Sequence, residues 1–176
     1  MVDESLYAYM RLQLELTCSD FHRYLYNDVN WNARMIAITG ARGVGKSTMV
    51  LQYLKTQISD CKVLYISADH TFFTTHTLVE VADDFSKEAG SLLVIDEVHK
   101  YPDWSRELKQ IYDTHPDMKV IFTGSSVLDI IDGVADLSRI AEGSDSFLTQ
   151  QNQLAQALSA KRLEQVTRRK DADWLT

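Results

Sequence analysis

The chain has 176 residues, of which 45% are hydrophobic and 24% charged, a balance typical of a soluble globular domain. Its net charge of -7 and pI near 5.1 disfavour a dedicated non-specific nucleic-acid binder, because such proteins present a basic surface. No run of about 18 apolar residues occurs, so we expect no membrane partner. Cys18 and Cys61 show no metal-ligand spacing and the N-terminus lacks a signal-peptide pattern, which favours a reduced, cytoplasmic protein.

In chain order, the first expected element is a helical segment over about residues 3–27, within an N-terminal stretch of 1–30. Four short apolar runs predict strands, at residues 35–39, 62–67, 92–95 and 118–122. Helical patterns separate these runs, at about 46–58, after the capping-box pattern Thr77–Glu80, and after Pro102-Asp103. Strands that are apolar on both faces and alternate with helices predict an α/β fold, a three-layer sandwich with a mainly parallel sheet. Ligands of such sheets bind at the carboxyl ends of the strands.

Between the first strand and the next helix lies a complete phosphate-binding motif. Gly40-Ala41-Arg42-Gly43-Val44-Gly45-Lys46-Ser47 matches G-x-x-x-x-G-K-[ST], the P-loop pattern, whose backbone N–H groups and following helix face an anion. We expect Gly40 through Thr48 to line a nucleotide, Lys46 to reach its β- and γ-phosphates, and Ser47 to offer its hydroxyl to Mg²⁺. The alternative, an ordinary glycine-rich turn, is disfavoured by the strand before the motif and the helix after it.

Two carboxylates follow the apolar run at 92–95. We expect this strand to lie beside the P-loop strand, with Asp96 near the metal through a water and Glu97 polarising the attacking water. Solvated acids at a strand end are the alternative, which the complete P-loop about 50 residues earlier disfavours. No N-K-x-D pattern, which would read guanine, follows the P-loop, so the expected ligand is ATP with Mg²⁺.

Further candidates come later in the chain. Thr123-Gly124-Ser125-Ser126 ends the fourth expected strand, and a hydroxyl there, Thr123 foremost, would touch the γ-phosphate or the attacking water; a capped turn is the alternative. Arg139 is a candidate arginine finger acting on a neighbouring subunit's nucleotide, with a solvated surface arginine as an equal alternative. The histidines show no ligand-pair spacing, so we expect no metal site built from protein groups alone.

Together these segments resemble a known family. RYLYNDVNWNARMIAITGARGVGKST, IDEVHKYPDWSRELKQIYD, VIFTGSSVLDI and ADLSR are similar to prokaryotic AAA-type ATPases in which an N-terminal P-loop ATPase domain precedes a nuclease-like C-terminal domain. The resemblance covers about residues 21–139. It implies ATP hydrolysis, with Glu97 as catalytic glutamate, Thr123 as sensor and Arg139 in an intersubunit finger. It leaves a homo-oligomer or another protein partner open, and implies nucleic-acid contact only through the missing C-terminal domain.

After Arg139 the chain departs from this family pattern. We therefore expect a truncated P-loop ATPase domain at 1–139 and an atypical helical or disordered tail at 140–176, which is frameshifted, rearranged or degenerate; a true family variant with its own helical tail is the alternative. The strand at 35–39 would then form a sheet edge, unless the N-terminal segment or a helix at about 150–169 covers it. The sequence predicts an ATPase that serves as a switch or motor with reduced activity. A nucleotide-binding module with negligible turnover and a P-loop small-molecule kinase are the alternatives, and the adjacent carboxylates disfavour the kinase.

Overall fold

The computed structural model describes residues 1–18 and 24–125. Its strands are β1 (Met35–Thr39), β2 (Val63–Ser67), β3 (Leu92–Asp96) and β4 (Lys119–Gly124). Its α-helices are α1 (Glu4–Leu16), α2 (Lys46–Gln57), α3 (Leu78–Lys87) and α4 (Trp104–Thr114). Short 3-10 helices lie at η1 (Tyr24–Asn27), η2 (Thr71–Thr74) and η3 (Val98–Lys100). Strands and helices therefore alternate from β1 to β4, as the sequence pattern predicts.

The four described strands form one parallel sheet in the order β1-β4-β3-β2. The expectation that the Asp96 strand lies beside the P-loop strand is wrong, because β4 is inserted between β1 and β3. The chain leaves β1 through α2 to the far side of the sheet, and the two later strands fill the space between β1 and β2. Among the described strands, β1 and β2 are the edges. The carboxyl ends of all four strands meet at one side of the sheet.

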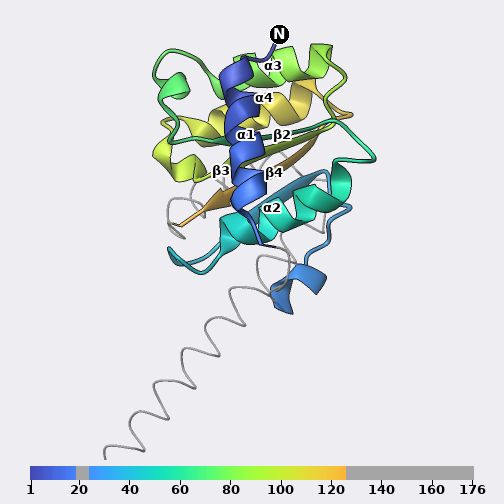
Figure 1. Ribbon diagram of the computed structural model, residues 1–176. Coiled ribbons are helices and arrows are strands. Elements are labelled where there is room, and N and C mark those ends of the chain that lie inside the picture. The colour runs from blue at the N-terminus through green and yellow to red at the C-terminus, as the bar shows by residue number, and fades with distance from the viewer. Residues whose placement is uncertain (19–23, 126–176) are drawn as a thin grey trace, which may run out of the picture. The chain divides into compact units, whose positions relative to one another are not determined.

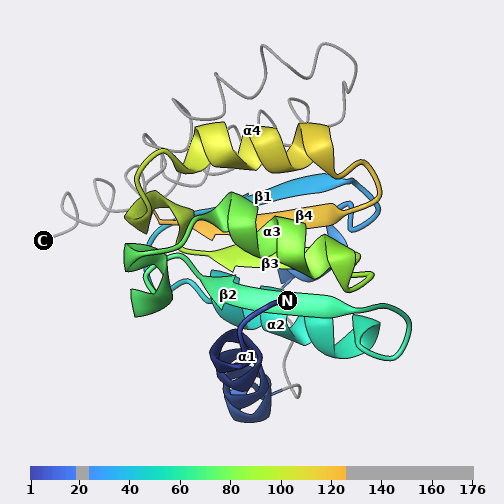
Figure 2. The same ribbon diagram turned by 90° about the horizontal axis from the view of Figure 1, so that it is seen from above.

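Helices cover both faces of the sheet, which gives three layers (Figures 1 and 2). On one face, α1 and α2 share an apolar core with alternate strand residues such as Ile36, Val94 and Ile121. On the other face lie α3 and α4, which contact one another and have strongly amphipathic patterns. Strands covered on both sides must be apolar on both sides, and β3 is buried throughout. The α/β sandwich with a parallel sheet is confirmed.

The N-terminal helix is shorter than the expected segment of 3–27. It begins after Asp3, whose carboxylate accepts the N–H of Ser5 at 2.8 Å, and it ends at Leu16. Its buried stripe consists of Leu6, Met10 and Leu14, and this four-residue spacing stops where the helix stops. α1 packs along β2 with this stripe. Across the described residues, none of the helices has the length and apolarity that crossing a bilayer requires.

The third helix shows how closely a local pattern can specify an element boundary. The Thr77 hydroxyl accepts the N–H of Glu80 at 3.1 Å, and the Glu80 carboxylate accepts the N–H of Thr77 at 2.8 Å. This reciprocal capping box is the one that the sequence predicts. The pattern is read within four residues, so no tertiary contact is needed to find it.

Candidate functional site

The phosphate-binding loop connects β1 to α2. Gly40, Gly43 and Gly45 all have positive φ, of 153°, 78° and 83°, a region that side chains with a Cβ rarely adopt. Gly45 is the N-cap of α2 and provides no side-chain capping bond. The first-turn N–H groups of α2 therefore lack a side-chain cap, and the positive end of the helix dipole adds to their preference for an anion. The loop backbone and the start of α2 together form an anion cradle.

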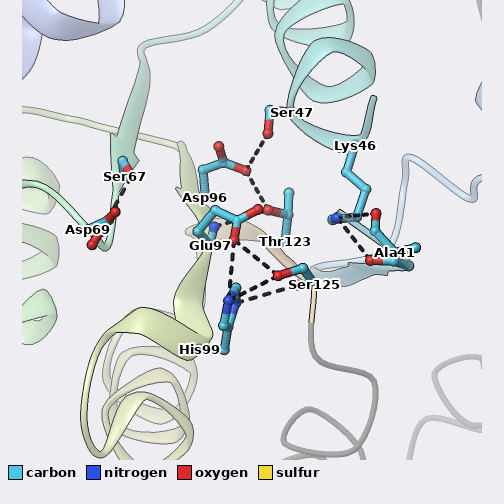
Figure 3. A network of polar contacts seen from close by, with 11 residues as sticks. Ala41, Lys46, Ser47, Ser67, Asp69, Asp96, Glu97, His99, Thr123 and Ser125 are labelled. Atoms are coloured by element: carbon cyan, nitrogen blue, oxygen red, sulfur yellow. Dashed lines mark hydrogen bonds and ion pairs between the residues drawn. The ribbon is translucent and has the colours of Figure 1, made fainter. Parts of the chain in front are cut away.

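Lys46 is the first residue of α2 and bends back over this loop. Its Nζ donates to the carbonyl oxygens of Gly40 at 2.9 Å and Ala41 at 3.1 Å (Figure 3). Its side chain is almost wholly buried, while the loop residues 41–44 and Thr48 are exposed. A buried ammonium in contact with an exposed loop supplies positive charge where a phosphate would lie.

Asp96 receives hydroxyl groups from three different elements. Its Oδ1 accepts from Ser47 at 3.0 Å and also from Thr123, and its Oδ2 accepts from Tyr65 at 2.7 Å. Asp96 ends β3 and is buried, so each of these donors compensates for lost water. Burial and the neighbouring Asp96 carboxylate raise the pKa of Tyr65, which keeps its hydroxyl protonated as a donor. The P-loop helix and the sheet are thus joined through one carboxylate.

The next residue, Glu97, has an unusual backbone conformation. Its φ of 55° and ψ of 42° lie in the left-handed region, which costs a non-glycine residue about 1–2 kcal/mol. The Glu97 N–H donates to the Thr123 hydroxyl at 3.1 Å, which holds this turn. The Glu97 side chain remains partly exposed, whereas Asp96 is buried. Two adjacent carboxylates therefore occupy different environments, one suited to a metal and one to a solvent molecule.

The Glu97 carboxylate contacts two further polar groups. Ser125 Oγ donates to Glu97 Oε2 at 3.3 Å, and His99 Nε2 lies 3.3 Å from the same oxygen (Figure 3). Ser125 and His99 also contact each other at 3.0 Å. The side chain of Thr123, by contrast, is fully buried and bonded on both sides. The hydroxyl that contacts the Glu97 carboxylate is therefore that of Ser125, two residues after Thr123.

Sequence reasoning singled out Lys46, Ser47, Asp96, Glu97 and Thr123, and the structure brings them together at the carboxyl end of the sheet. It missed Tyr65 and His99. Tyr65 reads as an ordinary apolar residue of β2, and His99 has no ligand-pair spacing because its partner Ser125 comes from the end of β4. Arg139 and the tail at 140–176 lie outside the described residues.

The donor atoms at Asp96 fit a hard divalent cation. The Ser47 hydroxyl and an Asp96 carboxylate oxygen lie 3.0 Å apart at the start of α2. Mg²⁺ prefers oxygen ligands and keeps waters and phosphate oxygens in its shell. Within residues 1–18 and 24–125 there is no group of three or more His, Cys, Asp or Glu side chains that could hold a metal. Ser47 and Asp96 would therefore hold Mg²⁺ together with a nucleotide rather than alone.

Comparison with known families agrees with this geometry. Residues 32–144 match the family model described as AAA domain. The chain belongs to the AAA domain family. The match begins at Asn32, before β1, and includes the P-loop, Asp96, Glu97 and Thr123.

Solved structures from Thermotoga maritima, C. elegans and Aquifex aeolicus are among those similar to this AAA domain. Domain III of the replication initiation protein DnaA from Thermotoga maritima is 18% identical, with a TM-score of 0.40 over 70% of this chain and 52% of that chain. PCH-2 of C. elegans is 20% identical, with a TM-score of 0.40 over 74% and 39% of the two chains. AMPPCP-bound DnaA from Aquifex aeolicus is 17% identical, with a TM-score of 0.38 over 76% and 42%. The chain thus spans about half or less of each of these proteins. No curated protein matches the sequence.

Proposed function

We propose that this AAA domain binds Mg·ATP at the P-loop and hydrolyses it to ADP and phosphate. The observation that carries the proposal is the Ser47–Asp96 hydrogen bond of 3.0 Å, which places the P-loop hydroxyl against the strand-end carboxylate. An isolated glycine-rich turn would have no reason to be joined in this way to a buried acid from another strand. The left-handed, partly exposed Glu97 next to Asp96 adds a candidate base.

The residues have distinct roles in this proposal. The N–H groups from Gly40 to Thr48 surround the phosphates, and Lys46 exchanges its loop carbonyls for β- and γ-phosphate oxygens. Ser47 and Asp96 hold Mg²⁺, which when bound with the nucleotide neutralises charge on the phosphate oxygens. Glu97 accepts a proton from the attacking water, and Ser125 and His99 orient its carboxylate. Thr123 holds the Asp96–Glu97 turn.

The wider role is also a proposal. We place this domain among prokaryotic ATPases whose ATPase domain precedes a nuclease-like domain, on the segments IDEVHKYPDW and VIFTGSS. Hydrolysis would then act as a switch or motor in a homo-oligomer or with another protein partner. Turnover by an isolated domain would be low, since a candidate finger such as Arg139 would act on the nucleotide of a neighbouring subunit and stabilise its charge.

Phosphate release and ATP binding, measured on wild type and Glu97→Gln, test the chemistry. We expect Glu97→Gln to bind ATP like wild type by calorimetry and to lose hydrolysis, because glutamine keeps the shape and removes the base. Glu15→Gln, at an exposed position of α1, is the matched control and should behave like wild type in both assays. ATP binding by wild type without any phosphate release would favour the nucleotide-binding module. Release that depends on an added acceptor would favour the kinase.

A further inference from the structure

The hydroxyl of Tyr65 contacts one carboxylate oxygen of Asp96, Oδ2, whereas Ser47 of the P-loop contacts the other, Oδ1. Tyr65 pairs with Val94 across β2 and β3, and Ser67 pairs with Asp96, so the tyrosine stands two residues back on the same face of the sheet. A long side chain can span this diagonal, and Tyr65 OH donates to Asp96 Oδ2 at 2.7 Å. Tyr65 is 1% exposed and Asp96 6% exposed, so water contributes little at this contact.

This contact restricts the rotation of the carboxylate. Thr123 and Ser47 donate to Oδ1, whereas Tyr65 donates to Oδ2. Hydrogen bonds to both oxygens, from β2 on one side and β4 on the other, fix the plane of the group and keep Oδ1 directed at Ser47. Partners that orient a metal-binding carboxylate in this way raise metal affinity without touching the metal.

The ring of Tyr65 is itself held from outside the sheet. Tyr9 of α1 stacks on it with a centroid separation of 6.1 Å and an interplanar angle of 14°. α1 lies along β2, and its buried stripe anchors it there. A series of contacts therefore connects Tyr9 of α1 to Tyr65 and Tyr65 to Asp96, and neither tyrosine belongs to the P-loop motif.

We propose that Tyr65 is a positioning residue for the Mg²⁺ site, acting through Asp96, and that α1 supports it through Tyr9. This inference rests on the proposed function, since it concerns the same Mg·ATP site. In this proposal the tyrosine acts on the metal only through its hydrogen bond to Asp96. Its loss should therefore weaken the metal-dependent part of nucleotide binding and leave the metal-independent part unchanged.

The test measures ATP affinity by calorimetry over a Mg²⁺ titration, and Mn²⁺ binding in the presence of ATP by electron paramagnetic resonance. Tyr65→Phe keeps the buried ring and removes the hydroxyl, so we expect roughly tenfold weaker apparent affinity for both cations. ATP affinity in EDTA should equal that of wild type. Tyr7→Phe is the matched control. Tyr7 also lies in α1, and its hydroxyl donates a hydrogen bond of 2.9 Å to the Glu88 carboxylate, away from the site.

The outcomes separate the two proposals. A wild-type protein whose ATP binding ignores Mg²⁺ contradicts the proposed function itself. A wild type that responds to Mg²⁺, with Tyr65→Phe and Tyr7→Phe both unchanged, overturns the role of Tyr65. If Tyr65→Phe does not fold, Tyr9→Leu replaces it: this variant removes the ring stacked on Tyr65 and leaves the Tyr65 hydroxyl in place. Tyr9→Leu should weaken the apparent cation affinity at least twofold. An unchanged affinity would overturn the inference.

Discussion

The hydroxyl of Thr123 accepts the backbone N–H of Glu97 at 3.1 Å. The same hydroxyl donates to Asp96, so one fully buried group joins the two acidic residues of the site. It holds the left-handed backbone at Glu97 and orients the carboxylate that faces Ser47. The turn between β3 and η3 therefore depends on a residue from the neighbouring strand.

This relationship predicts different behaviour for two substitutions at one position. Thr123→Val removes both hydrogen bonds while keeping the shape, and leaves a buried N–H without an acceptor, so the free energy of unfolding should fall by roughly 1–3 kcal/mol. Thr123→Ser keeps the hydroxyl, so its free energy of unfolding should fall much less. Urea unfolding measures the difference, with Thr114→Val at an exposed site as the control that stays within about 0.5 kcal/mol of wild type. Equal unfolding of the valine and serine variants would contradict the role.

The left-handed backbone at Glu97 predicts how glycine and alanine at this position differ in stability. Glu97→Gly should be more stable than Glu97→Ala by roughly 1 kcal/mol, because glycine tolerates a φ of 55° and alanine does not. Both variants should lack hydrolysis. Ala89, with a φ of 60°, is a control remote from the chemistry, and Ala89→Gly should also be stabilising. Thermal unfolding that ranks Glu97→Ala equal to Glu97→Gly would show that the turn is unstrained.

Nucleotide binding should depend on one lysine of α2 and not on another. Lys46→Ala removes the ammonium that lies against Gly40 and Ala41, and should abolish most Mg·ATP affinity. Lys55→Ala, two turns later on the same helix, also removes an ammonium bonded to a backbone carbonyl, that of Thr17 at 2.5 Å, and should leave ATP affinity unchanged. Calorimetry on both variants decides. Retained affinity in Lys46→Ala, or an equal loss in both, would contradict the P-loop assignment.

Acid should weaken the attachment of the N-terminus through Glu88. Lys62, the N–H of Val2 and the Tyr7 hydroxyl lower the pKa of Glu88 to about 2 from its ordinary value of 4.5. A lowered carboxyl pKa stabilises the fold above pH 4.5, and this contribution is lost as the pH falls from 4.5 toward 2. Urea midpoints between pH 5 and pH 3 should therefore fall more steeply for wild type than for Glu88→Gln. Parallel pH profiles of the two proteins would exclude this contribution.

The local patterns of this sequence predict its four described strands and most residues of its candidate site. Four apolar runs became the four described strands, the Thr77–Glu80 box became the start of α3, and the P-loop glycines adopt the positive φ values that their motif requires. These features depend on neighbouring residues along the chain, through backbone dihedral preferences and the period of burial. That is why Lys46, Ser47, Asp96, Glu97 and Thr123 could be named from the sequence as candidate site residues.

Only the tertiary structure decided how these residues are connected. The insertion of β4 between β1 and β3 places Thr123 and Ser125 beside residues that precede them by 26 to 28 positions, and this order has no local signature. Tyr65 and His99 likewise gain their roles from partners on other strands. A side chain's periodicity tells which face of a strand it occupies, but its hydrogen-bond partner depends on which strand lies alongside, and that is determined by the packing of the whole sheet.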